Sequence, residues 1–191
     1  VVLMRQADRS IDAQYYMWHQ DIVGRFLVYE LVDAANRGVR VRLLVDDMYG
    51  GDGEDTWLAM DAHPNIEVRL FAPYSRRQPK VLQFLTRFHD VNARMHTKTL
   101  TVDRAATIVG GRNIGDEYFG ANTDLEFADN DVLAIGSPAD EVSVVFNDYW
   151  NSDYAYSVSR LASPVGLGEL QQLEASAAAF RQRAEVATYV S

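Results

Sequence analysis

A histidine, a lysine and an asparagine near the middle of the chain have side chains suited to chemistry on a phosphate ester. His96 and Lys98 lie two residues apart within 95–103, where apolar and polar residues largely alternate. This alternation predicts a half-buried strand, and residues two apart on a strand project from the same face. A second predicted strand follows at once, and Asn113 lies just beyond it. We therefore expect an imidazole, an ammonium and an amide to face one site.

The second predicted strand, 106–109, ends in two glycines, where backbone amides can approach a ligand closely. Lys98, Asn113 and the amides near Gly111 could neutralise and orient phosphate oxygens without a metal ion or a cofactor. His96 could then attack phosphorus to form a covalent phosphohistidine, or protonate a leaving alcohol. Each residue alone is better explained as a strand histidine, a solvated lysine or a turn glycine. Only the combination favours a phosphodiester site.

The spacing of these residues resembles a known signature. It reads His96-x-Lys98-x4-Asp103-x6-Gly-Gly111-x-Asn113 and is similar to the HKD motif of the phospholipase D superfamily. The continuation from Asn113 to Gly120 resembles the bacterial cardiolipin synthase branch, and weaker similarity runs from Ser10 to about Asn151. Many members carry Ser where this chain has Gly111, a departure that removes one hydroxyl donor from the expected phosphate site.

The resemblance implies roles for individual residues. His96 corresponds to the nucleophile, and Lys98, Gly111 and Asn113 to the phosphate-binding groups. Asp103 belongs to the catalytic signature, although in relatives its side chain looks structural and holds the turn after the strand. The resemblance also implies an acid that bonds the far nitrogen of His96, and Asp129 is the best match. Other carboxylates remain possible for this role: Asp124, Glu126 and Asp131.

The family's active sites generally combine two HKD motifs, whereas this chain contains one. A second histidine is needed because the first is consumed as the nucleophile while another group must protonate the departing alkoxide. None of the remaining histidines begins a second motif. Either two copies form a homodimer, or the chain is the amino-terminal half of a longer enzyme, and the similarity to cardiolipin synthases favours the second.

The function implied by the resemblance is phosphatidyl transfer or phospholipase D hydrolysis on phospholipids, with phosphatidylglycerol the expected substrate and cardiolipin the expected product. We expect a bacterial protein that is membrane-associated in its full-length form and soluble as this chain, with peripheral membrane contact. One alternative is a homodimeric, metal-independent nuclease with a single motif. Another is a catalytically incomplete module that only binds phosphate.

Composition narrows these choices. The chain has 191 residues, a formal net charge of −9 and no cysteine. It is long enough for a substantial core, and it offers no disulfide or thiolate site. The negative charge speaks against a general nucleic-acid binder. A locally basic stretch at 76–98 on this acidic chain fits an anionic substrate, or equally a solvated loop.

Periodicity predicts an α/β fold. A strand, a helix capped by Asp21 and a second strand follow each other closely at 10–18, 21–38 and 39–45, which is typical of a right-handed βαβ unit. We predict a mixed, largely parallel sheet flanked by helices on both faces. The remaining predicted elements are a helix at 55–63, strands at 66–71 and 132–135, and a helix at 138–149.

Two segments have weaker sequence signals for a function. Asp46 and Asp47 end a predicted strand and are interpreted as turn or capping acids. An amphipathic helix is expected at 79–89, either as a lipid-facing lip or packed on the sheet.

We divide the chain into a catalytic half at 1–151, a linker at 152–168 and an amphipathic helix at 169–191, which docks on the same domain or on a missing second half.

Overall fold

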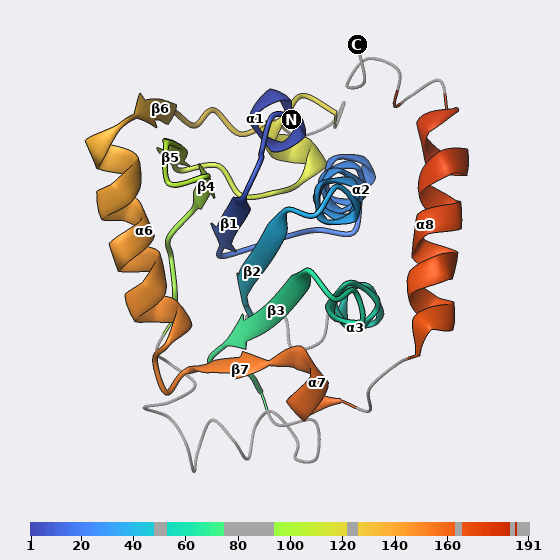
Figure 1. The fold of residues 1–191 in the computed structure, drawn as a ribbon. Coiled ribbons are helices and arrows are strands. Elements are labelled where there is room, and N and C mark those ends of the chain that lie inside the picture. Colours follow the sequence, from blue (N-terminus) through green and yellow to red (C-terminus); the bar gives the residue numbers. More distant parts are fainter. Residues whose placement is uncertain (48–52, 75–93, 122–125, 163–165, 184–185, 187–191) are drawn as a thin grey trace.

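A computed structural model describes residues 1–47, 53–74, 94–121, 126–162, 166–183 and 186. Within these residues, seven strands form one mixed sheet in the order β6-β5-β4-β1-β2-β3-β7 (Figure 1). The strands are β1 (Ser10–Tyr15), β2 (Arg40–Asp46), β3 (Ile66–Phe71), β4 (Thr99–Val102), β5 (Ala106–Gly110), β6 (Asp131–Ile135) and β7 (Ala155–Ser157).

The parallel part of the sheet is smaller than predicted. The pairs β1–β2 and β2–β3 are parallel, as the βαβ prediction requires. The other pairings among the described strands are antiparallel: β1–β4, β4–β5, β5–β6 and β3–β7. Three residues, 103–105, join β4 to β5, and a parallel crossover needs a dozen or more. The sheet is therefore mixed, with its parallel part confined to the three strands β1, β2 and β3.

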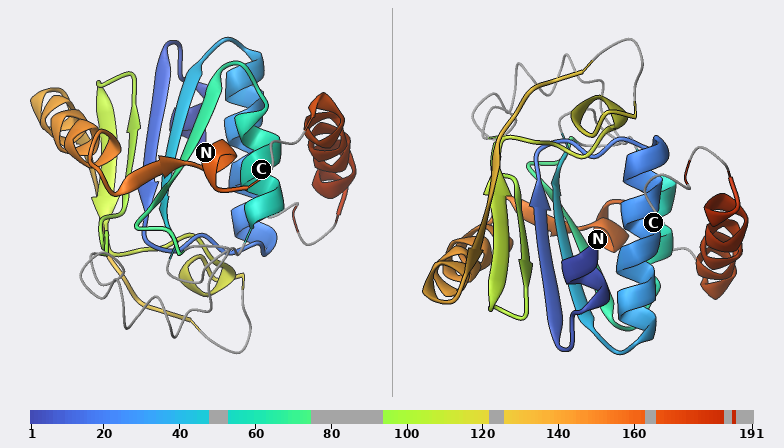
Figure 2. Two further views of the ribbon diagram at one scale, coloured as in Figure 1. Left: turned by 90° about the horizontal axis from the view of Figure 1, so that it is seen from below. Right: turned by 90° about the horizontal axis from the view of Figure 1, so that it is seen from above.

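Helices cover both faces of the sheet, as predicted (Figure 2). On one face lie α2 (Ile22–Asn36) and α3 (Glu54–Asp61), and α6 (Ser137–Trp150) covers the other. Asp21 caps α2 by accepting a hydrogen bond from the amide of Gly24 at 2.9 Å. Beyond the carboxyl end of that helix Gly38 takes the left-handed φ of 95° that ends many helices. The shorter helical elements are α1 (Val2–Arg5), η1 (Asp116–Tyr118) and α7 (Val158–Leu161).

A buried ion pair fixes α6 to the sheet. Arg42 of β2 forms two hydrogen bonds of 2.7 Å with Asp12 of β1, and a third of 2.9 Å with Asn147 of α6. Its guanidinium also lies 4.7 Å from the ring centroid of Phe146. We expected both Val145 and Phe146 on the inward face of α6; Phe146 is buried, whereas Val145 is 48% exposed.

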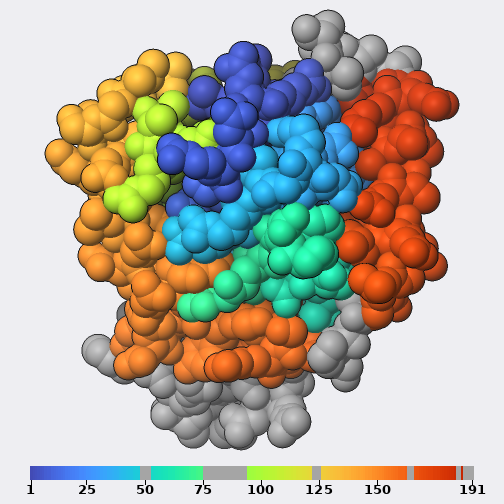
Figure 3. Space-filling model, in the orientation of Figure 1, coloured from blue at the N-terminus to red at the C-terminus, as the bar shows by residue number. Residues whose placement is uncertain are grey.

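The segment predicted as a linker contributes to the sheet. Within 152–168, β7 pairs with the outer edge of β3, and α7 packs against α3 and β7. The last described helix, α8 (Leu167–Arg181), packs on α2 and α3 of this same domain. Figure 3 shows its red residues along one flank of the molecule, beside the lighter blue of α2 and the teal of α3. Leu170, Ala177 and Phe180 are its buried residues.

Two predictions lie outside the described residues. The amphipathic helix at 79–89 falls within 75–93, and the alternative orienting acid Asp124 falls within 122–125. They remain predictions.

Candidate active site

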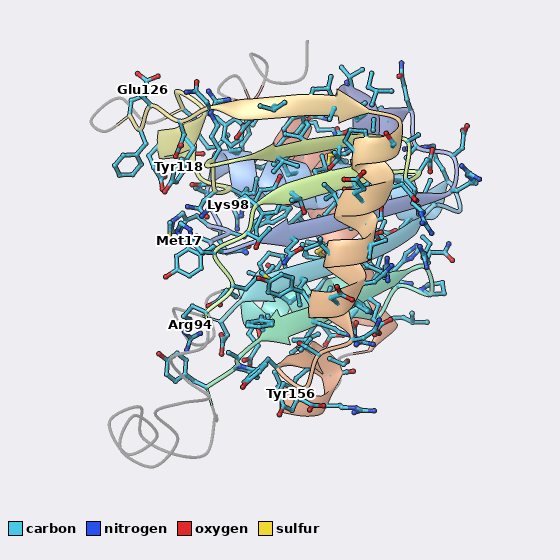
Figure 4. The ribbon with its side chains drawn as sticks, turned by 90° about the vertical axis from the view of Figure 1, so that its left-hand side faces the viewer. Met17, Arg94, Lys98, Tyr118, Glu126 and Tyr156 are labelled. Atoms are coloured by element: carbon cyan, nitrogen blue, oxygen red, sulfur yellow. The ribbon has the colours of Figure 1, made fainter. Side chains whose placement is uncertain are left out.

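The topology of the sheet brings the ends of five strands to one edge. Because β1 and β4 are antiparallel, the start of β4 lies beside the end of β1, with Gln14 opposite Thr99. The end of β2 lies at the same edge, since β2 runs parallel to β1. Antiparallel pairing also brings the end of β5 and the start of β6 there, with Gly110 opposite Asp131. We call this the His96 edge, because His96 and Lys98 immediately precede β4. Figure 4 labels Lys98 at this edge.

His96 and Lys98 face each other, although they precede the strand instead of lying within it. The predicted strand 95–103 is a strand only over Thr99–Val102. Lys98 Nζ lies 3.0 Å from His96 Nε2 and donates to the backbone oxygen of His96 at 3.1 Å. His96 is exposed, whereas Lys98 keeps 5% of its surface accessible. The ammonium thus lies beneath an imidazole that is open to solvent.

If Lys98 is charged, this contact requires one tautomer of neutral His96. An ammonium group has donors and no acceptor, so the ring nitrogen facing charged Lys98 must be unprotonated. Neutral His96 then carries its proton on Nδ1 and directs the Nε2 lone pair at Lys98. A ligand oxygen that takes over the ammonium contact would leave this lone pair available for attack.

Burial and a neighbouring carboxylate act on Lys98 in opposite directions. Burial lowers its pKa, because an ammonium is less well solvated in the protein than in water. The negative charge of Asp129 partly offsets this effect and raises the pKa. The ring of Tyr16 provides a further contact, with Lys98 Nζ 5.3 Å from its centroid. The sequence predictions did not include Tyr16, which directly follows β1 and whose ring centroid lies 4.8 Å from that of His96.

Asn113 is held at the same edge by two hydrogen bonds. Its side-chain oxygen accepts from the amide of Met17 at 3.1 Å, and its nitrogen donates to the hydroxyl of Tyr118 at 3.0 Å. The neighbouring backbone reinforces this position, since the backbone amide of His19 donates to the backbone oxygen of Ile114 at 2.9 Å. Figure 4 shows Met17, Lys98 and Tyr118 along one edge of the sheet. An amide nitrogen has two N–H groups, so Asn113 keeps a second donor for a ligand.

Asp129 lies at the His96 edge, but it does not make the contact expected of an orienting acid. Within the described residues, no carboxylate is within hydrogen-bonding distance of His96. Instead the Asp129 carboxylate packs against Gly111: a Cβ built on Gly111 would lie 2.0 Å from Asp129 Oδ1. The alternative acid Asp131 packs in the same way against Gly110 and faces Arg112, with Arg112 Nη1 3.4 Å from its Oδ2. The other alternative, Glu126, is exposed.

Asp103 lies at the opposite edge of the sheet, because it follows β4 whereas His96 precedes it. Its carboxylate accepts from the backbone amides of Asp8, Arg9 and Ser10 at 2.7–2.9 Å. These hydrogen bonds lower the pKa of Asp103 against a desolvation that raises it. The structure therefore does not bring Asp103 to the other signature residues, and its contacts are those of a turn that secures the start of β1.

Asp46 has a different role from the turn or capping acid expected. It is buried at the end of β2 and accepts from the amide of Met95 at 2.8 Å and from Arg94 Nη1 at 2.9 Å. Met95 itself is buried in an apolar cluster with Phe146 and Trp150. Burial raises the pKa of Asp46 to about 6, although both hydrogen bonds oppose the rise. The two residues before His96 are thus fixed by a carboxylate and by core packing. The position of Asp46 at the carboxyl end of a parallel strand was the available sequence signal.

A cavity of about 500 Å³ opens beside Asp129. Its lining combines carboxylate, amide, phenol and guanidinium groups with two partly exposed phenylalanines, Phe119 and Phe127. It offers room for a group larger than phosphate beside Tyr118, the residue whose hydroxyl accepts from Asn113. Within the described residues, no set of three or more His, Cys, Asp or Glu side chains is arranged to hold a metal ion.

Comparison with known sequences gives a consistent family. A family model described as "Cardiolipin synthase, PLD-like domain" matches residues 1–150. Cardiolipin synthase C of Escherichia coli is 47% identical over 167 residues, covering 87% of this chain and 35% of that protein. A cardiolipin synthase of Geobacillus kaustophilus is 30% identical over 162 residues, covering 84% of this chain and 30% of that protein. The chain spans about a third of the length of these relatives.

Solved structures share the fold at low sequence identity. Phosphatidylserine synthase of Haemophilus influenzae has a TM-score of 0.64 and 18% identity, covering 95% of this chain and 39% of its own. Nuc from Salmonella typhimurium, a phospholipase D family member, has a TM-score of 0.56 and 20% identity, covering 82% of this chain and 86% of its own. These likenesses support the predicted phospholipase D fold.

Proposed function

This chain belongs to the family described as "Cardiolipin synthase, PLD-like domain", and we propose that it supplies one half of an active site that transfers a phosphatidyl group between alcohols. The observation that carries the proposal is the 3.0 Å contact between His96 Nε2 and Lys98 Nζ at an open edge of the sheet. A nucleophile beside a cation is the arrangement that attack on an anionic phosphodiester needs.

In the first step, phosphate oxygens of the phospholipid take over the ammonium contact of Lys98 and bind the free amide donor of Asn113. The Nε2 lone pair of His96 then attacks phosphorus, a P–N bond forms, and the P–O bond to the headgroup alcohol breaks. The departing oxygen takes a proton from a second acid. A second HKD motif would supply it, from another part of a longer chain or from a second copy.

In the second step, the acceptor alcohol attacks the phosphohistidine. A new P–O bond forms, the P–N bond breaks, and the alcohol proton passes to the group that acted as acid before. His96 returns to its neutral state with Nε2 free. If the acceptor is the headgroup of phosphatidylglycerol, the product is cardiolipin, and if it is water the reaction is hydrolysis.

The expected substrate is a phospholipid, with phosphatidylglycerol favoured because two relatives above 29% identity are named cardiolipin synthases. The site would have to meet its substrate at a bilayer surface, and we propose peripheral contact for the protein that carries this chain. None of the helices in the described part is long and apolar enough to traverse a bilayer.

The proposal is tested by trapping the intermediate. The enzyme that carries this chain is mixed with a short-chain phosphatidylglycerol, quenched in alkali, which preserves phosphohistidine, and digested for mass spectrometry. A phosphatidyl adduct is expected on the peptide containing His96, and His96→Asn should abolish both adduct and lipid turnover. His63→Gln is the matched control, because His63 contacts Asn36 at the carboxyl end of α2 and should leave turnover intact. Unchanged turnover in His96→Asn would overturn the proposal.

The nuclease alternative has less support. Nuc from Salmonella typhimurium and NucT from Helicobacter pylori share 20% and 15% identity with this chain, which shows a common fold and no more. The alternative predicts metal-independent cleavage of DNA by a dimer. The same preparation, incubated with single- and double-stranded DNA in a chelator, should show no cleavage.

A further inference from the structure

The two glycines that end β5 are each covered by a carboxylate. A Cβ on Gly111 would lie 2.0 Å from Asp129 Oδ1, and a Cβ on Gly110 would lie 1.8 Å from Asp131 Oδ1. Neither glycine has a positive φ, so the backbone conformation would admit other residues. The requirement for glycine is therefore spatial. At Gly111 the carboxylate of Asp129 occupies the place where the side chain of a serine would begin.

The register of the sheet connects this carboxylate to Lys98. The amide of Gly110 donates to the backbone oxygen of Lys98 at 3.3 Å, and the amide of Gly111 donates to the oxygen of Asn130 at 3.2 Å. Lys98, Gly111 and Asp129 thus lie on three adjacent chain segments at the His96 edge. Within the described residues, Lys98 is approached by the ring and backbone of His96, by the Tyr16 ring and by the charge of Asp129. Among these groups Asp129 is the one that carries a negative charge.

We infer that Asp129 is a positioning residue for Lys98 and that Gly111 is present to admit it. The carboxylate fills the space that a serine side chain would take, and its charge stabilises the ammonium form of the buried lysine. This inference rests on the proposed function, since it assigns a role within the same site. It differs from the orienting role expected for Asp129, because the partner is the lysine and not the histidine.

The arrangement makes a definite prediction about charge. Without the carboxylate, the burial of Lys98 acts alone, and its pKa should fall by about one unit, at the low end of the effect of a nearby opposite charge. A serine at Gly111 should act in the same way, because its Cβ would force the Asp129 carboxylate out of its place. The two changes should not add, since each removes the same charge from Lys98.

The experiment is a double-mutant cycle on this chain, read by NMR titration of the Lys98 side chain. The variants are Asp129→Asn, Gly111→Ser and the two combined. We expect a similar fall in the Lys98 pKa in all three. Asp131→Asn is the matched control, because Asp131 also covers a glycine but faces Arg112, and it should leave the Lys98 pKa within about 0.3 units of the parent, below the effect of a nearby charge.

An unchanged Lys98 pKa in Asp129→Asn, or additive effects in the combined variant, would overturn the inference. Amide spectra of each variant report folding. If Gly111→Ser does not fold, Asp129→Asn still decides the matter, because it changes the charge without adding bulk. The titration requires no turnover, so its outcome is independent of whether His96 forms a covalent intermediate.

Discussion

Asp46 and Asp103 each hold a neighbouring chain segment by accepting hydrogen bonds from backbone amides. The two residues lie at opposite edges of the sheet and in different surroundings. Asp46, at the His96 edge, has no exposed side-chain surface and binds one amide and Arg94. Asp103 is partly exposed and binds three amides. Burial raises the pKa of Asp46, while hydrogen bonds lower that of Asp103. The surroundings therefore disfavour the ionised form of Asp46 and favour the ionised form of Asp103.

The comparison indicates different roles for the two edges of the sheet. At the far edge, the partly exposed carboxylate of Asp103 stabilises the start of β1 through three backbone hydrogen bonds. At the His96 edge, buried charges are held in place by the surrounding structure: Asp46 by Arg94, and Lys98 beside Asp129. Such groups cost stability when buried and are retained where a reaction needs fixed geometry. Changes at the His96 edge should affect turnover, and changes at the far edge should affect stability.

The largest effect is expected for Lys98→Met. The change removes the cation that would balance charge on the phosphate, and it should lower kcat/KM for phosphatidylglycerol about 10³-fold, as loss of one preorganised donor does elsewhere. The variant should remain folded, because methionine fills a similar volume. Lipid turnover in the enzyme that carries this chain measures the effect. Arg104→Met, an exposed cation at the far edge, should leave turnover unchanged.

Asp103→Ala should have the opposite effect, lowering stability while leaving turnover by the folded protein intact. Three backbone amides lose a charged acceptor, and the residue has a φ of 55°, which aspartate tolerates better than alanine. We expect the free energy of unfolding to fall by about 3 kcal/mol, measured by urea denaturation at pH 7. The kcat of the folded fraction should stay close to that of the parent. A loss of kcat comparable to that of Lys98→Met would place Asp103 in the chemistry after all.

The sequence predicted the fold class, and the family resemblance implied that Asp103 is structural, but hydrophobic alternation did not show which ends of the strands meet. Spacing in the sequence places His96, Asp103 and Asn113 in one motif. In the structure β4 runs from the His96 edge to Asp103 at the far edge, and β5 brings the chain back to Asn113. Strand direction therefore decided which residues meet. The antiparallel pairings could not be inferred from hydrophobic alternation, because alternation reports one strand and says nothing about its neighbour.

The contacts of Asp46, Tyr16 and Asp129 were also beyond the sequence. Each depends on segments distant in the chain, such as Asp46 with Met95 and Asp129 with Gly111. The absence of serine at Gly111 was visible, but its reason was not, since a carboxylate eighteen residues later fills the space. Long-range packing of this kind leaves no local pattern.

The opposite pKa changes of the two aspartates predict opposite responses to pH. The folded pKa of Asp46, about 6, exceeds its usual 3.8, so its contribution to stability is complete below pH 3.8 and is lost as pH rises through 6. The loss relative to Asp46→Asn should be about 2 kcal/mol between pH 4 and pH 7. For Asp103, whose pKa is lowered, the contribution is present above pH 3.8 and is lost as pH falls below it. Urea denaturation of the parent, Asp46→Asn and Asp103→Asn over this range measures both, and slopes of the same sign would contradict the assignment.

The smallest effect is expected for Asp140→Ala, which removes an exposed carboxylate that bonds an arginine. Asp140 pairs with Arg104, the residue after Asp103, and both side chains are more than half exposed. Exposed ion pairs contribute little, because water and salt screen the attraction and two long side chains must be ordered. The free energy of unfolding should therefore change by less than about 0.5 kcal/mol, and turnover should not change. A loss as large as that of Asp103→Ala would mean that the far edge depends on charge pairing and not on the backbone hydrogen bonds of its turn.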